Sequence, residues 1–104
     1  NFITRNRCRA RFLFLDGHNQ RPPEMTGRII IIERADLGFD WIFTQNIAGL
    51  VTKFGGANSH MAIRCAELNL PAAIGCGAQI FDRLLKASAI ELDCSKGIVE
   101  PIWA

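Results

Sequence analysis

The chain has 104 residues, 49% of them hydrophobic, with 12 basic and 10 acidic residues for a formal net charge of +2. This length and apolar content predict one ordinary globular domain with a core of its own. Because the net charge is small and the chain lacks an apolar run of about 20 residues, we expect no nucleic-acid partner and no membrane partner.

The N-terminal region carries much of the excess positive charge. Four arginines alternate with other residues, at Arg5, Arg7, Arg9 and Arg11. A phosphate-rich partner would account for this pattern, but a solvated strand face or a linker is the preferred interpretation. The residues that follow become apolar, so the sequence predicts a strand over 9–15, ended by a cluster of turn formers.

The next two segments predict a buried strand and a short helix. Residues 28–34 contain four consecutive isoleucines, a run that is too short for a typical helix and rich in β-branched side chains. Such a run is typical of a parallel, central strand that is buried on both faces. Over 36–45, apolar residues follow Asp36 at helical spacing, which predicts a short helix or helical turn capped by Asp36.

A strand, a glycine turn and a helix follow one another in the middle of the chain. Residues 47–52 predict a short apolar strand, and the pair Gly55-Gly56 predicts a turn. A helix is expected from about Ser59 to Asn69, with Asn69 as its C-cap. The run "PAAIG" after it predicts another buried strand, so this part of the chain is expected to form a β-α-β unit.

The C-terminal region predicts one more helix and a hairpin. The helix is expected over 78–86, and the strands at 89–93 and 97–102 have the pattern of a β-hairpin. On one side of the helix we expect Ile80, Leu84 and Leu85. Together these elements predict a compact α/β domain with a mixed or layered sheet.

The four cysteines form no C-x-x-C pair, so their spacing suggests neither a zinc site nor a redox pair. We expect free thiols in a reducing compartment and, because the first residues lack a secretory signal, a cytoplasmic location. The four cysteines are Cys8, Cys65, Cys76 and Cys94.

One of only two histidines in the chain lies at the start of the central helix. On that helix His60, Arg64 and Glu67 share one polar stripe, which points away from the core. An exposed bystander histidine would fit the same pattern. Metal binding with Cys65 is disfavoured because the two side chains are roughly 140° apart around the helix, and we expect no metal site. A serine hydrolase is excluded by the absence of a G-x-S-x-G elbow.

The start of this helix has the chemistry of a phosphate site. The first amides of a helix lack internal acceptors and carry the positive end of its dipole, which favours a phosphate and a neutral imidazole. A neutral imidazole can accept a phosphoryl group through a ring nitrogen. Gly55 and Gly56 can adopt positive φ and let a phosphate approach the backbone. Asn58 and Ser59 would either cap the helix or donate hydrogen bonds to phosphate oxygens.

Residues 49–75, "GLVTKFGGANSHMAIRCAELNLPAAIG", resemble the phosphohistidine signature of the mobile domain of PEP-utilizing enzymes. That family includes phosphoenolpyruvate synthase, pyruvate phosphate dikinase and enzyme I of the sugar phosphotransferase system. A weaker similarity extends over 28–99, and residues 1–25 resemble the incoming linker and first strand. The resemblance implies that 1–104 is a single mobile domain of a larger multidomain enzyme.

The resemblance also implies a fold and a function. The fold is the swivelling β/β/α three-layer domain, with a central mostly parallel sheet and a second antiparallel sheet. His60 would carry the phosphoryl group on Nε2, with Gly55, Gly56, Asn58, Ser59 and Arg64 around it. Such a domain binds no cofactor. It shuttles phosphate between an ATP-grasp or other nucleotide-binding module and a barrel that binds phosphoenolpyruvate or pyruvate, where Mg²⁺ and ATP or phosphoenolpyruvate are expected.

Several positions depart from the family pattern. Asn58 replaces a threonine that is a regulatory phosphorylation site in some dikinases, and Asn69 replaces a glycine. The usual Ala-Arg pair of the helix is Cys65-Ala66, and the nearby Arg64 lies about 200° from position 66 around the helix. A noncatalytic docking domain with the same fold is therefore the alternative, and the sequence leaves the final phosphoryl acceptor open.

Overall fold

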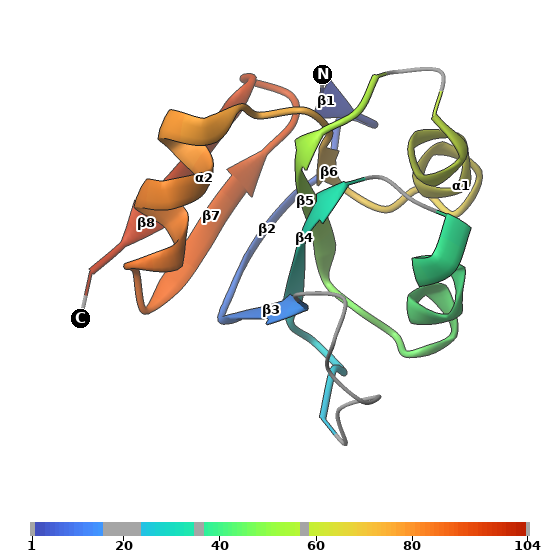
Figure 1. The fold of residues 1–104 in the computed structure, drawn as a ribbon, viewed down its shortest axis with the longest axis horizontal. Coiled ribbons are helices and arrows are strands. Elements are labelled where there is room, and N and C mark those ends of the chain that lie inside the picture. The colour runs from blue at the N-terminus through green and yellow to red at the C-terminus, as the bar shows by residue number, and fades with distance from the viewer. Residues whose placement is uncertain (1, 16–23, 35–36, 57–58, 104) are drawn as a thin grey trace.

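A large sheet lies between a pair of helical segments and a smaller sheet (Figure 1). The computed structural model describes residues 2–15, 24–34, 37–56 and 59–103. Their elements in chain order are β1 (Phe2–Ile3), β2 (Arg7–Ala10), β3 (Phe12–Leu15), β4 (Ile29–Arg34), the 3-10 helix η1 (Leu37–Thr44), β5 (Gly49–Phe54), α1 (His60–Glu67), β6 (Ala72–Ala73), α2 (Ala78–Leu85), β7 (Ala89–Asp93) and β8 (Ile98–Ile102).

The two sheets differ in strand direction. The larger has the order β1-β6-β5-β4-β3, and its pairs are parallel except for β1 with β6. The smaller has the order β2-β7-β8 and is antiparallel throughout. The α1 crossover joins parallel neighbours β5 and β6, as the β-α-β pattern predicts. The predicted α/β fold class, with a mostly parallel sheet and a second antiparallel sheet, is confirmed.

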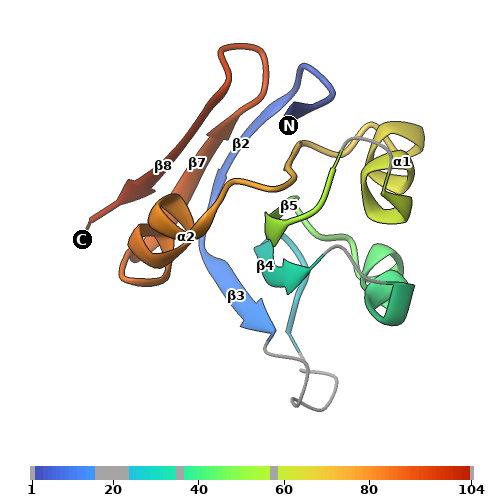
Figure 2. The same cartoon turned by 45° about the horizontal axis from the view of Figure 1, so that its top comes forward.

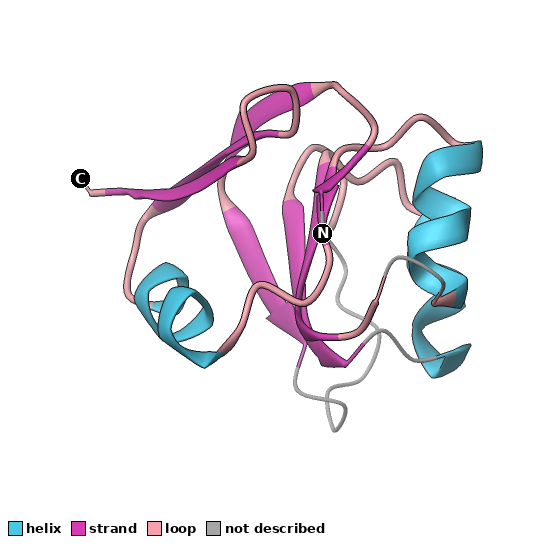
Figure 3. Cartoon of the chain, turned by 90° about the horizontal axis from the view of Figure 1, so that it is seen from above, coloured by secondary structure: helices cyan, strands magenta, loops and turns pink. Residues whose placement is uncertain are grey.

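Three layers result from this topology. The helices α1 and η1 lie along one face of the larger sheet, whereas the smaller sheet and α2 lie on its other side (Figures 2 and 3). Each face of the larger sheet has its own apolar cluster: one packs it against η1 and α1, the other against α2 and β7. The β/β/α layering implied by the family resemblance is therefore confirmed.

Strand β4 is buried on both faces, as its sequence predicts. Its four isoleucines have no exposed surface. Because side chains alternate along a strand, Ile30 and Ile32 belong to the cluster under η1 and α1, and Ile29 and Ile31 to the cluster under α2. The neighbours on both sides, β3 and β5, pair with β4 in parallel, so the expected central and parallel position is also confirmed.

The single strand predicted over 9–15 is wrong. The chain forms β2 up to Ala10 and β3 from Phe12, and these two strands belong to different sheets. Arg11 lies between them, and its carbonyl accepts a hydrogen bond from the Ile29 N–H at 2.9 Å, beside the start of β4. Arg7 and Arg9 are exposed on β2, which confirms a solvated strand face. Most of the turn cluster that follows, with His18, lies outside the described residues.

Two other elements differ slightly from their predicted form. The short helix expected over 36–45 is the 3-10 helix η1, whose expected cap Asp36 lies outside the described residues. The strand expected over 47–52 is β5, which begins two residues later and continues to Phe54. Ile47 is instead buried in the cluster under η1.

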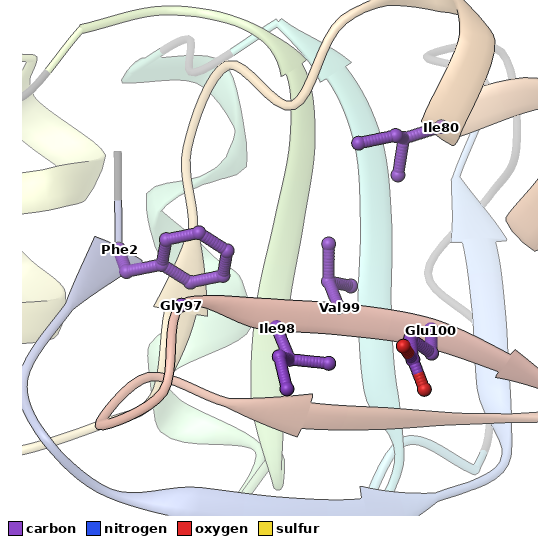
Figure 4. Close-up of a pocket in the computed structure, with 6 residues that line it drawn as sticks. All are labelled: Phe2, Ile80, Gly97, Ile98, Val99 and Glu100. Atoms are coloured by element: carbon purple, nitrogen blue, oxygen red, sulfur yellow. The ribbon is translucent and has the colours of Figure 1, made fainter.

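The predicted apolar side of α2 is partly wrong. Phe81 and Leu84 are buried, and the Phe81 ring packs edge-on against Phe14 with centroids 5.8 Å apart. Ile80 is 36% exposed and lies beside a hollow of about 250 Å³. Figure 4 shows Ile80 above Val99, with the Phe2 ring to their left. Because Ile80 and Phe81 are adjacent and both apolar, the sequence does not show which of them faces the core. In the structure the larger Phe81 ring is buried.

All four cysteines are free thiols, as expected. Two are buried and two are half-buried, and burial raises the pKa of Cys8 to about 11 and that of Cys65 to about 12. These thiols are therefore poor nucleophiles, because the thiolate is the reactive form. In the described part of the chain, no helix has the length and apolarity that a membrane span requires.

Candidate functional site

The candidate site lies where β5 leaves the larger sheet and α1 begins. Strand β5 ends at Phe54, Gly55 and Gly56 follow, and the first residue of α1 is His60. Asn58, one of the predicted site residues, lies outside the described residues. Because β4 and β5 are parallel, the site shares the carboxyl edge of the sheet with the end of β4. Ligands of open α/β sheets bind at that edge.

The two glycines of the loop have different conformations. Gly55 has φ of 129° and so uses the conformational freedom of glycine, whereas the φ of Gly56 lies outside the positive range. A side chain at Gly56 would meet nothing within 4 Å, so this side of the loop is open. Gly55 packs tightly instead: a Cβ on Gly75, which has φ of 71°, would overlap the Gly55 carbonyl oxygen.

A buried threonine at the end of β5 holds the glycine loop in place. The Thr52 hydroxyl donates to the Phe54 carbonyl at 2.9 Å and accepts from the Gly75 N–H at 2.9 Å. The Thr52 carbonyl accepts from the Cys76 N–H at 2.9 Å. Because Thr52 has no exposed surface, these hydrogen bonds are shielded from water. Thr52 thus ties the chain entering the site to the segment after β6.

Ser59 is the N-cap of α1. Its φ of −68° and ψ of 154° are extended, and its hydroxyl oxygen accepts a hydrogen bond from the Ala62 N–H at 3.3 Å. This confirms the capping role expected at this position. The cap uses one lone pair of Ser59, so its O–H can still donate to another group.

The other end of α1 closes slightly earlier than predicted, because the helix ends at Glu67 and its C-cap is Leu68, with Asn69 as the next residue. Asn69 has φ of 56°, the left-handed conformation that asparagine tolerates better than most residues. Its N–H donates to the Ala66 carbonyl at 3.2 Å, and the Leu70 N–H donates to the Cys65 carbonyl at 2.8 Å. This pair of bonds is a Schellman motif. Asparagine therefore serves in place of glycine, and both ends of the helix that carries His60 are fixed.

His60 lies at the surface and not in the core. Its side chain is 40% exposed, and Nε2 lies 2.8 Å from Oδ1 of Asp40, which η1 supplies. Asp40 is itself 47% exposed, so solvent reaches both groups. The amphipathic pattern of α1 correctly predicts that the ring points away from the interior.

The predicted polar stripe of α1 faces η1. The Arg64 Nε lies 3.6 Å from the same Asp40 oxygen, and Arg64 Nη1 lies 3.6 Å from Glu67. The Arg64 guanidinium also lies over the Phe43 ring, 5.5 Å from its centroid. His60 and Arg64 therefore share one carboxylate. Each of these exposed pairs contributes only about 0.2–1 kcal/mol.

The opposite side of α1 packs into the core. Met61, Ala62 and Cys65 are buried there, which separates the Cys65 thiol from the exposed ring of His60. Leu68, at the helix end, is 48% exposed. Within the ranges that the structure describes, no three His, Cys, Asp or Glu side chains come close enough together to hold a metal ion.

The sequence missed two residues of this site. Asp40 and Thr52 lie in segments whose sequence is dominated by apolar residues. Asp40 is the sole charged residue of η1, and Thr52 is a polar residue in a buried strand. A polar side chain in a buried part of a strand is a signal that could have identified Thr52, because buried polar groups need partners. Asp40 is exposed and gives no such signal.

Comparison with known proteins gives the family. The chain belongs to the family described as "PEP-utilising enzyme, mobile domain", which matches residues 25–97 and so includes the glycine loop and α1. A relative is the phosphoenolpyruvate synthase of Synechocystis sp., which is 34% identical over 71 residues. This similarity covers 68% of the present chain and 8% of that synthase, so the chain spans a small part of its relative.

Proposed function

We propose that this domain carries a phosphoryl group on His60, which it accepts at one partner module and yields at another. The observation that supports the proposal best is the exposed imidazole at the first position of α1, within the segment that matches the family. A side chain that is reached by two different modules in turn has to lie at the surface. The ring of His60 is accessible in this way.

The proposed transfer needs one nucleophilic nitrogen and stabilisation of charge. A lone pair of the neutral ring attacks phosphorus, the N–P bond forms, and the P–O bond to the leaving group breaks with its electron pair kept by oxygen. By resemblance the attacking atom is Nε2. We assign stabilisation of the developing charge to the first amides of α1 and to the Ser59 hydroxyl, which belong to the same helix end as His60. The reverse sequence of bond changes passes the group to the acceptor.

The remaining parts of the reaction are assigned to partner modules. We propose that a nucleotide-binding module, of ATP-grasp or another type, and a barrel for phosphoenolpyruvate or pyruvate bind the substrates. We assign Mg²⁺ to those modules as well, as the family resemblance implies. The four free thiols are compatible with a cytoplasmic location, where disulfides are rare.

The test is labelling of the full-length protein with phosphoenolpyruvate or γ-labelled ATP, followed by mass spectrometry. Cleavage after Lys53 and Arg64 yields a peptide with one histidine, and Ser59 is its only hydroxyl residue. We expect a modification that is lost in acid and kept in base, as a phosphohistidine is. A phosphoserine at Ser59 would survive acid, so this test distinguishes the two residues. The His60→Ala variant should lose it, and His18→Ala, a change at the only other histidine, should keep it.

Two outcomes would contradict the proposal. If the His60→Ala variant kept full phosphotransfer, His60 would not be the carrier. If the peptide stayed unmodified during turnover, the noncatalytic docking domain would be the better account, and the departures at Arg64, Cys65 and Ala66 would then mark lost transfer chemistry.

A further inference from the structure

The carboxylate of Asp40 determines where the proton of His60 lies in this arrangement. A carboxylate can only accept, so at 2.8 Å the Nε2 atom must donate its hydrogen to Oδ1. The neutral ring then has its free lone pair on Nδ1. The nitrogen that faces η1 is thus unavailable as a nucleophile while the contact lasts.

The same contact is incompatible with a phosphoryl group on Nε2. One nitrogen cannot hold both the hydrogen that binds Asp40 and a bond to phosphorus. A phosphoryl group at that place would also put negative charge against the carboxylate, and like charges at such separations repel. His60 must therefore leave Asp40 before or during phosphorylation and stay away from it afterwards.

Arg64 keeps Asp40 in this position. It lies on the same face of α1, one turn after His60, and its Nε approaches the same carboxylate oxygen at 3.6 Å. Its guanidinium packs over Phe43 of η1 as well. Because Arg64 contacts η1 in two ways, these contacts favour a carboxylate position beside α1 also when the ring of His60 is not bound to it.

We propose that Asp40 is a positioning residue that holds the unphosphorylated ring of His60 against η1 and disfavours the phosphorylated one. This inference rests on the proposed function, since it concerns the same histidine. The ring then has two positions: one bound to Asp40, and one in which Nε2 is free to react. The fraction of rings in the free position scales the rate at which Nε2 is phosphorylated.

The experiment uses potassium phosphoramidate, which phosphorylates histidine without any partner module. The initial rate at Nε2 of His60 is measured in the wild type and in Asp40→Ala. We expect the variant to react roughly two- to fivefold faster, the range that corresponds to an exposed ion pair. Glu67→Gln is the matched control: it removes one negative charge from the same network, next to Arg64, without touching His60. Its rate should equal that of the wild type.

A second measurement separates positioning from a structural effect. Nitrogen NMR of the neutral ring should show the proton held on Nε2 in the wild type and exchanging between both nitrogens in Asp40→Ala. Asp40→Asn retains an acceptor oxygen without the charge, so it should restore the Nε2 proton and give an intermediate rate. This variant preserves the size of the side chain and keeps the proposal testable if Asp40→Ala fails to fold.

Three results would overturn the inference: equal rates in the wild type and Asp40→Ala, a slower rate in Asp40→Ala, or the same acceleration in Glu67→Gln. The proposed function fails on a different result, the absence of label from phosphoenolpyruvate and ATP. Loss of that label with an accelerated phosphoramidate reaction would leave the role of Asp40 intact. Normal label with unchanged phosphoramidate rates would refute the role of Asp40 alone.

Discussion

Replacing Gly75 by alanine is expected to destabilise the domain and to disturb the loop that precedes His60. Two effects add at this position. Gly75 has φ of 71°, where an alanine side chain is strained, and its new Cβ would overlap the carbonyl oxygen of Gly55. The backbone of the glycine loop would have to move, because a carbonyl cannot rotate away as a flexible side chain can.

Two other glycines separate these effects. Gly27 has φ of 74° but nothing within 4 Å of the added Cβ, so Gly27→Ala measures backbone strain alone, about 1–2 kcal/mol. Gly56 has neither the positive φ nor a close neighbour, so Gly56→Ala should change stability little or raise it slightly. For Gly75→Ala the overlap adds about 1–3 kcal/mol to the strain, which gives a total of about 2–5 kcal/mol.

Urea and thermal unfolding of the three variants measure these differences. A domain of this size loses about 4–8 °C in Tm for each kcal/mol lost from its free energy of unfolding. We therefore expect the highest Tm for Gly56→Ala, a lower Tm for Gly27→Ala and the lowest Tm for Gly75→Ala. Equal losses for Gly27→Ala and Gly75→Ala would show that the Gly55 carbonyl yields easily. The tight packing of the glycine loop inferred from the structure would then be refuted.

The remaining predictions concern the hairpin and α2. The pKa of Asp93 is lowered from its ordinary value of 3.8, first by the hydrogen bond from the Ser95 hydroxyl at 2.6 Å. The charged carboxylate therefore stabilises the fold at pH values above 3.8. This stabilisation is lost as the pH falls through the lower pKa of the folded state. Asp93→Asn should therefore be less stable than the wild type at neutral pH in urea unfolding, with a gap that narrows in strong acid; a gap independent of pH would contradict this. Leu84→Ala should lose about 2–5 kcal/mol in the same assay because Leu84 is fully buried, and Ile80→Ala clearly less; the reverse order would contradict the orientation of α2.

Local sequence signals predicted the elements whose partners are close in the chain. The isoleucine run of β4 indicates burial on both faces by itself, and the cap at Ser59 and the left-handed Asn69 define α1 within a dozen residues. The hairpin of β7 and β8 likewise depends on residues next to its own turn. In each case the deciding contacts join residues near one another in sequence.

The features that were missed depend on distant partners. The break between β2 and β3 follows from pairing of Arg9 with Glu91 on β7 and of Phe12 with Ile29 on β4, and neither partner is visible in the alternation of residues 9–15. The contact of Asp40 with His60 spans 20 positions and requires η1 to pack beside α1. Apolar periodicity indicates that one face of a helix is buried, but it does not identify the element against which that face packs.

The uniform composition of β4 has a consequence for how the chain finds its alignment. Where one face of a strand is polar, a slip by one residue exposes apolar groups and is penalised, but in this strand it would exchange one isoleucine for another. The correct alignment has to be selected at the strand ends. The Ala48 N–H donates to the Arg28 carbonyl at 2.8 Å, the Gly27 N–H donates to the Asn46 carbonyl at 3.0 Å, and the exposed Glu33 resists being drawn inward. Errors of alignment during folding should therefore arise from changes at these borders and not from changes among the isoleucines.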